Sequence, residues 1–215
     1  MNERLKQIAR LARQNAAADS AHDFSHCLRV LANALRIAEA EGGDPEVLTA
    51  AAFLHDISNL PKNHPESHLS SERSAARACE IVAPLAFPPE KMRALGDAIL
   101  CHSYSRGLDP QTLEGRVFQD ADRLDALGAI GVARTFAVGG ALNRKMYSLE
   151  DPFTRLGRTP DDKDNTVDHF FVKLFKLGGK MQTPTGQKLA RERLSAMQSF
   201  MDQLESEIGP EFELE

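Results

Sequence analysis

The sequence has few cysteines, no long apolar run and no excess of basic residues. Its three cysteines, Cys27, Cys79 and Cys101, have no Cys-x-x-Cys spacing, which predicts reduced thiols and a cytoplasmic location rather than a disulfide framework. No apolar run approaches ~20 residues, and the N-terminal residues lack a signal-peptide core, so we expect no membrane partner. A net charge of −5 argues against a nucleic-acid partner. A phosphate ligand would therefore need local cations or a metal.

Helical periodicity runs along most of the chain, without a strand pattern or an internal repeat. We therefore predict an all-α fold, with helices at about 3–17, 23–41, 45–56, 71–82, 89–102, 126–133, 170–177 and 185–208. The length of 215 residues suits a single domain over 1–215, with a core at about 20–140 and a helical extension at about 141–210. The Ala- and Gly-rich stretch 126–133 is typical of a central helix, and 139–165 predicts a long loop or lid.

Two of these helices are expected to form an antiparallel hairpin. Gly42–Gly43 closes the first helix, and Asp44 with Pro45 provides the N-cap and first turn of the second. At ~1.5 Å per residue the two arms span roughly 22 and 15 Å, so His26 and His55 return to the same level and can share one ion. On the first helix we expect an apolar stripe to face the core, formed by Leu28, Leu31, Leu35 and Ala38.

An apolar run, Ala50–Leu54, leads directly into His55 and Asp56. A charged group at the end of an apolar helix is costly unless something pairs with it. A divalent metal would do so, because imidazole and carboxylate together suit a borderline cation. With His26 upstream and Asp122 downstream, the set reads H…HD…D.

This pattern resembles the HD superfamily of metal-dependent phosphohydrolases, and is most similar to bacterial HD-domain proteins that resemble nucleoside-triphosphate pyrophosphohydrolases. The resemblance covers about residues 20–200. It implies an HD-type helical bundle around a central metal site, with His26, His55, Asp56 and Asp122 as ligands. These ligands leave about two octahedral positions open and suit one Mn²⁺, Co²⁺, Ni²⁺ or Fe²⁺ better than Mg²⁺; we expect Mn²⁺.

The general base is left open by the sequence. Many members of the superfamily place an acid three residues after the HD aspartate, where this chain has Asn59. Asp125, His64 or His102 could act as the catalytic base, or the metal could activate water without one. A second metal site formed by His64, His68 and His102 is an alternative, although their spacing differs from that of two-metal relatives.

Three aspartates follow one another closely before the Ala- and Gly-rich stretch. Asp122 matches the last aspartate of the superfamily pattern, which is followed by x-Leu. Asp125 lies at i+3 on the same helix face, so it could support the metal or contact the substrate. We expect Asp120 to act as the N-cap of its own helix.

Substrate contacts are predicted at six cationic or imidazole side chains: Lys62, His64, Arg123, Lys145, His169 and Lys173. Lys62 is favoured because it lies six residues after Asp56, in a proline-braced loop that leaves the metal end of its helix. For the segment Asp168–Phe170 the alternative to substrate contact by His169 or Lys173 is the start of a solvated helix, followed by a Phe/Leu core stripe.

The resemblance implies hydrolysis of (deoxy)nucleoside triphosphates to monophosphate and pyrophosphate, so the expected partner is a small nucleotide. A 5′-nucleotidase or a cyclic-nucleotide phosphodiesterase could use the same site. A metal-dependent nucleotide sensor with weak catalysis is a third possibility, which Asn59 keeps open. A homo-oligomer is compatible with the sequence.

Overall fold

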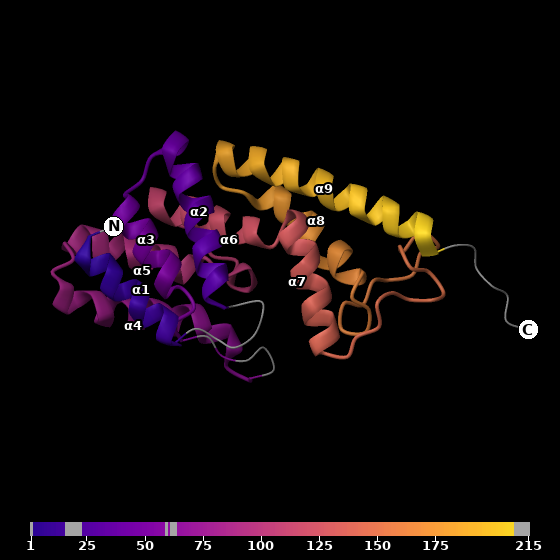
Figure 1. The fold of residues 1–215 in the computed structure, drawn as a ribbon, viewed down its shortest axis with the longest axis horizontal. Helices are drawn as coiled ribbons and strands as arrows, with labels where there is room; N and C mark the ends of the chain where they lie inside the picture. Colours follow the sequence, from indigo (N-terminus) through magenta and orange to yellow (C-terminus); the bar gives the residue numbers. More distant parts are fainter. Residues whose placement is uncertain (1, 16–22, 59, 61–63, 209–215) are drawn as a thin grey trace, which may run out of the picture. The chain divides into compact units, whose positions relative to one another are not determined.

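The structure, a computed structural model, describes residues 2–15, 23–58, 60 and 64–208, and it is built from helices (Figure 1). In chain order the elements are α1 (Glu3–Asn15), α2 (Phe24–Glu41), α3 (Pro45–Leu54), η1 (Ser67–Leu69), α4 (Ser70–Val82), η2 (Ala83–Leu85), α5 (Pro89–Cys101), η3 (Tyr104–Arg106), α6 (Leu113–Asp125), α7 (Gly128–Ala141), η4 (Phe170–Leu174), α8 (Phe175–Leu177), η5 (Gly178–Lys180) and α9 (Pro184–Ile208). Within these ranges the only β pairing is an isolated bridge between Lys145 and Asn165. The predicted all-α class is confirmed.

The chain divides into two compact units. The first contains Met1–Asp125 and Met181–Lys188, and the second contains Ala126–Lys180 and Leu189–Glu215. The proposed division into a core at about 20–140 and an extension at about 141–210 stays a prediction.

Helix α3 is the centre of the first unit. Every residue from Val47 to Leu54 is buried, because α1, α2, α5 and α6 all pack around it. Its three consecutive alanines let the neighbouring backbones come close. Its first turn is fixed as predicted: Asp44 accepts hydrogen bonds from the backbone N–H groups of Glu46 and Val47. The expectation that 126–133 forms the central helix is wrong, because Ile130 of α7 is 40% exposed.

The buried face of α2 is not the leucine stripe expected from the sequence. Leu28 and Leu35 are 47% and 40% exposed, whereas the buried residues are His26, Cys27, Val30, Asn33, Ala34 and Ile37. This face carries two polar side chains, and both find partners across the contact with α6. The pattern of apolar residues therefore predicted the wrong buried face. It does not take into account polar side chains that are buried with hydrogen-bond partners inside the protein.

Asp120 does not cap its own helix, as we had expected. It lies inside α6, is fully buried, and accepts hydrogen bonds from the backbone N–H groups of Gln182 and Thr183 and from the Thr183 hydroxyl. Burial raises the pKa of the Asp120 carboxyl, although the hydrogen bonds from Gln182 and Thr183 lower it. The carboxylate thus fixes the segment that leads into α9.

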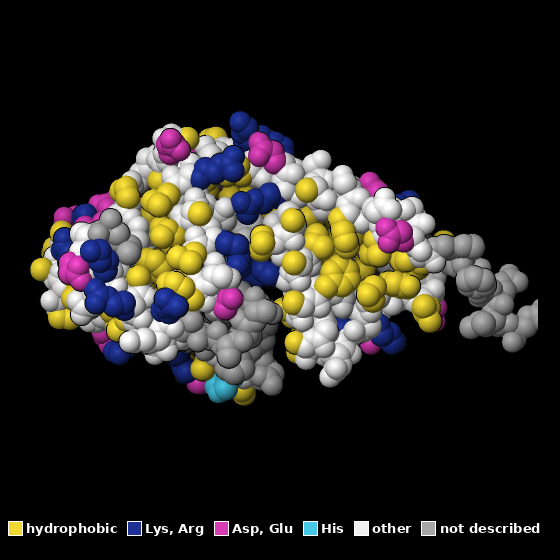
Figure 2. Space-filling view, in the orientation of Figure 1, with side chains coloured by type: hydrophobic (Ala, Val, Ile, Leu, Met, Phe, Trp, Pro, Cys, Tyr) yellow, Lys and Arg dark blue, Asp and Glu magenta, His cyan; other side chains and the backbone are white. Residues whose placement is uncertain are grey.

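The second unit has an aromatic core and an ordered irregular segment. The ring of Phe136 on α7 lies 6.2 Å from that of Phe170 and 5.8 Å from that of Phe200. Hydrophobic side chains also gather on the surface of this unit (Figure 2). In the non-helical segment after α7, Arg158 donates two 2.7 Å hydrogen bonds to Asp168, which is fully buried. Asp168 therefore begins a helical stretch, as considered from the sequence, but its side chain is buried rather than solvated.

Among the described residues, no single helix is long and apolar enough to cross a membrane. The helices α6 and α7 reach that length and composition only when they are joined across the break between them.

Candidate metal centre

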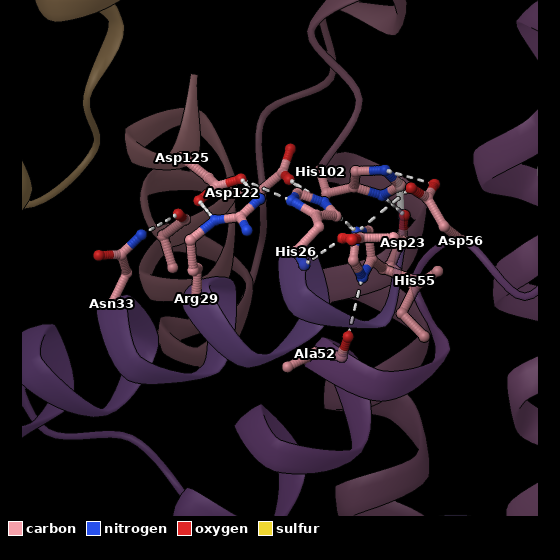
Figure 3. A network of polar contacts seen from close by, with 12 residues as sticks. Asp23, His26, Arg29, Asn33, Ala52, His55, Asp56, His102, Asp122 and Asp125 are labelled. Carbon is pink, nitrogen blue, oxygen red and sulfur yellow. Dashed lines mark hydrogen bonds and ion pairs between the residues drawn. The ribbon is translucent and has the colours of Figure 1, made fainter. Parts of the chain in front are cut away.

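The hairpin of α2 and α3 brings two imidazoles together. His26 lies in the first turn of α2, where Asp23 caps the helix, and His55 is the C-cap residue of α3. Their Nε2 atoms are 3.1 Å apart, and both rings are buried (Figure 3). The predicted return of the two arms to one level is therefore found in the structure.

Two carboxylates complete the cluster. Asp56 Oδ2 lies 3.5 Å from His55 Nε2, and Asp122 Oδ1 lies 3.5 Å from His26 Nε2 and 3.9 Å from His55 Nε2. The Asp56 and Asp122 side chains are 20% and 22% exposed, so the cluster is closed at the imidazoles and reachable at the carboxylates. All four predicted ligands are thus brought together.

The outer nitrogen of each imidazole is occupied. His26 Nδ1 lies 2.7 Å from Asp125 Oδ2, and His55 Nδ1 lies 3.1 Å from the carbonyl oxygen of Ala52. Because a carbonyl or carboxylate oxygen can only accept, each Nδ1 carries the hydrogen and donates it. In the neutral ring the lone pair is then on Nε2, the atom that faces the cluster.

This arrangement fits a divalent cation. Two Nε2 lone pairs face each other beside carboxylate oxygens, and ligand atoms of His26, His55 and Asp56 all lie within 4.8 Å of one another. Acceptors at such distances repel one another unless a proton or a cation lies between them. Neutral imidazole and carboxylate are ligands of first-row divalent metals, so the residues present match the ion that the sequence pattern predicts.

Burial keeps the inner imidazole neutral. It lowers the pKa of His55 to about 4, against the opposing influence of the Asp56 carboxylate. Burial likewise raises the pKa of the neighbouring Cys27 thiol to about 12, with Asp56 adding to the effect. The thiol is therefore a small uncharged core group beside the site, and the imidazole is free of a competing proton near neutral pH.

A third imidazole, His102, lies beside the cluster at the C-cap of α5. Its Nδ1 donates to the Ile99 carbonyl at 2.7 Å, so its Nε2 lone pair faces Asp56 Oδ1 at 3.8 Å. Its ring meets that of His55 edge-on, with centroids 5.1 Å apart. His102 thus repeats the orientation of His55 at the end of another helix.

The second metal site considered from the sequence is not formed by the described residues. His64 and His68 are exposed, and each makes a local contact, with the backbone of Glu66 and of Pro65 respectively. Neither joins a group of converging metal-ligand atoms in the described ranges. Of the three histidines, only His102 lies at the cluster.

Arg29 is a site residue that the sequence analysis missed. Its guanidinium donates to both oxygens of Asp125, from Nε at 2.7 Å and from Nη2 at 3.1 Å. The signal was present in the spacing, because Arg29 is at i+3 from His26 just as Asp125 is at i+3 from Asp122.

The remaining predicted positions are spread over the chain. Arg123 is buried, and burial lowers the pKa of its guanidinium although Asp120 and Asp122 raise it. Lys62 and Asn59 lie outside the described residues. Lys145, His169 and Lys173 belong to the second unit, where Lys145 pairs with Asp164 and His169 with Asp162. Their roles in substrate binding stay predictions.

Residues 23–127 match the HD domain family. This range begins at the cap of α2, ends just after α6, and includes all four predicted ligands.

Several bacterial proteins are similar over nearly the whole chain. YpgQ of Bacillus subtilis (strain 168) is 31% identical over 201 aligned positions, and the match covers 88% of this chain and 85% of YpgQ. The crystal structure of Bacillus subtilis YpgQ in complex with ADP has a TM-score of 0.73 at 30% identity and 97% coverage of both chains. A crystal structure from Lactobacillus plantarum has a TM-score of 0.75 at 31% identity, with 96% of this chain and 98% of that chain covered. An HD-superfamily hydrolase from Bacillus thuringiensis has a TM-score of 0.71 at 31% identity, with 95% and 94% covered.

Proposed function

Because this chain belongs to the HD superfamily of metal-dependent phosphohydrolases, we propose that it hydrolyses (deoxy)nucleoside triphosphates to monophosphate and pyrophosphate. The observation that carries the proposal is the convergence of two Nε2 lone pairs with an Asp56 oxygen, beside which Asp122 Oδ1 lies 3.5 Å from His26 Nε2. The family defines the chemistry as phosphate-ester or anhydride hydrolysis. A nucleotide substrate is supported by the relative YpgQ, which has been crystallised with ADP.

His26, His55, Asp56 and Asp122 would hold the metal, with Mn²⁺ favoured by the mixed nitrogen and oxygen donors. When bound, the ion would supply a Lewis acid that polarises a phosphoryl oxygen and acidifies water. The protein holds the imidazoles in the required tautomer through Asp125 and the Ala52 carbonyl. The more exposed carboxylates leave one side of the cluster open to an anionic ligand.

His102 is the best-placed of the three candidate bases. Its Nε2 lone pair faces Asp56 across 3.8 Å, a separation at which a water can contact both groups. A neutral imidazole there can take the proton of the attacking water at Nε2 and return it to the leaving oxygen. Asp125 is less suited to this role, because both of its oxygens are already engaged and it is buried. His64 is exposed and makes its contact within its own loop.

The proposal is tested by a product analysis with an isotope. The protein is incubated with Mn²⁺ and a panel of nucleoside tri-, di- and monophosphates and cyclic nucleotides in ¹⁸O-labelled water, and phosphate is separated from pyrophosphate. We expect pyrophosphate from triphosphates, with ¹⁸O in the monophosphate if water attacks the α-phosphorus. Release of orthophosphate from monophosphates, cleavage of cyclic nucleotides alone, or tight nucleotide binding without turnover would each replace the proposal by one of the alternatives above.

A further inference from the structure

The Arg29–Asp125 ion pair joins the same two helices that carry the metal site. Arg29 is on α2, one turn after His26, and Asp125 is on α6, one turn after Asp122. The guanidinium approaches side-on: Nε donates to Asp125 Oδ1 at 2.7 Å, and Nη2 donates to Oδ2 at 3.1 Å (Figure 3). Two parallel hydrogen bonds fix the plane of a carboxylate, which a single bond does not.

Asp125 transmits that fixed plane to the imidazole of His26. Its Oδ2 lies 2.7 Å from His26 Nδ1, and the side chain is 1% exposed. With one oxygen on Arg29 and the other shared between Arg29 and His26, the carboxylate is fully committed within the protein. It therefore acts on the site through His26 rather than through the substrate.

Arg29 is itself held at its other end. Its Nη1 donates to the Ser25 hydroxyl at 2.7 Å, and that hydroxyl donates to Asp23 Oδ1 at 2.6 Å. The same Asp23 oxygen accepts the backbone N–H of His26 at 3.0 Å. The hydrogen bonds thus form a continuous chain from the backbone N–H of His26, through Asp23, Ser25, Arg29 and Asp125, to the His26 ring.

We propose that Arg29 is a positioning residue for His26: through Asp125 it fixes the orientation and the Nδ1–H tautomer of that imidazole, and so sets the affinity of the site for its metal. The metal consequence depends on the function proposed above, whereas the tautomer does not. In the competing role the guanidinium would contact a substrate phosphate; three of its five N–H groups donate within the protein, from Nε, Nη1 and Nη2.

The test compares Arg29→Met, Arg29→Lys and Asn33→Ala with the parent protein. Asn33 is a matched control, because it also links α2 to α6, through a 3.1 Å hydrogen bond to the main-chain carbonyl of Ala121. Mn²⁺ affinity is measured by calorimetric titration, and the His26 tautomer is read from long-range ¹H–¹⁵N correlations of the metal-free protein. We expect Arg29→Met to weaken Mn²⁺ binding by about 10–100-fold, the usual effect of removing an outer partner of a ligand. Arg29→Lys, which cannot donate side-on, should fall between Arg29→Met and the parent.

The outcomes separate the two proposals. A lower melting temperature for Asn33→Ala, with parental Mn²⁺ affinity and tautomer, is expected and shows that loosening the helix pair is not sufficient. Unchanged affinity and tautomer in folded Arg29→Met, or in Arg29→Lys if the first variant does not fold, overturns the positioning role while the metal site stands. If no protein binds metal but the tautomer still changes in the Arg29 variants, the positioning role stands and the proposed function fails.

Discussion

The Nε2 atoms of His26 and His55 lie 3.1 Å apart although 29 positions separate the two residues in the chain. The distance is set by the α2–α3 hairpin, and the direction of each lone pair is set by an acceptor behind the ring. Helix ends are well suited to this task, since a side chain at a C-cap can donate back to a carbonyl of the preceding turn. The helix hairpin, the Ala52 carbonyl and the Asp125 carboxylate thus orient both imidazoles before any ligand binds.

Removal of a predicted ligand should remove the metal. We expect His55→Ala and Asp122→Ala each to lose most of the divalent ion that the parent binds, because both charge balance and geometry are weakened. The measurement is metal content by elemental analysis after chelation, Mn²⁺ readdition and desalting. Glu39→Ala, which removes an exposed carboxylate from α2, is the control and should retain the parental amount. Parental metal content in both ligand variants would contradict the assignment.

Acid should destabilise the metal-free protein in a window set by His55. The pKa of His55 is lowered by burial to about 4, from 6.5 in the unfolded chain. Above pH 6.5 neither state binds the proton, so the full stability is present. As the pH falls towards 4, only the unfolded state takes up the proton, and the free energy of unfolding decreases. At about 1.4 kcal/mol for each pH unit, the loss is on the order of 3 kcal/mol.

Urea unfolding of chelator-treated protein between pH 7 and 4 measures this loss. In a His55→Gln variant, which has no ionisable group at that position, the dependence on pH in this window should become shallower by the same amount. An equally steep dependence in that variant would assign the effect to other groups.

Much of the metal centre could be predicted from local sequence. The hairpin length, the cap at Asp44 and the apolar run before His55 each depend on residues within the hairpin itself, and all three appear in the structure. What could not be predicted is which polar groups are satisfied inside the protein. The buried face of α2 carries His26 and Asn33, whose partners lie on α6, about 90 or more positions away.

The wrong prediction for Asp120 has the same cause, since its hydrogen-bond partners are distant in the sequence. An aspartate just before a predicted helix is an N-cap by local rules, but α6 begins seven residues earlier, at Leu113. Its hydrogen-bond donors, at Gln182 and Thr183, are more than 60 positions away in the sequence. A local pattern cannot specify such a partner, so long-range capping is seen only once the chain is folded.

Loss of the Asp120 carboxylate should destabilise the first unit without changing the metal ligands. In Asp120→Ala the backbone donors of Gln182 and Thr183 lose their acceptor, at a cost of about 1–3 kcal/mol for each donor left buried. Urea unfolding at neutral pH measures the cost. Thr183→Val removes the hydroxyl that donates to Asp120 and accepts from the Gly186 N–H; it leaves the Asp120 carboxylate and its two backbone donors in place and should cost less. Equal stability of Asp120→Ala and the parent would show that the carboxylate is not needed to fix this segment.

The role of His102 can be separated from that of the metal ligands by comparing turnover with metal content. If His102 accepts the proton of the attacking water, His102→Gln should lower kcat for the preferred nucleotide by about 10²–10⁴-fold, the usual contribution of a positioned acid–base group. Metal content should remain at the parental value, because His102 Nε2 lies 3.8 Å from Asp56 and His102 belongs neither to the converging group nor to the ligand set that the HD pattern implies. His68→Gln is the control, because His68 is exposed on η1, and it should keep parental turnover. Loss of the metal in His102→Gln would identify His102 as a metal ligand. Parental kcat with parental metal content would show that His102 is not the general base, and a substrate group or metal-activated water would then take that role.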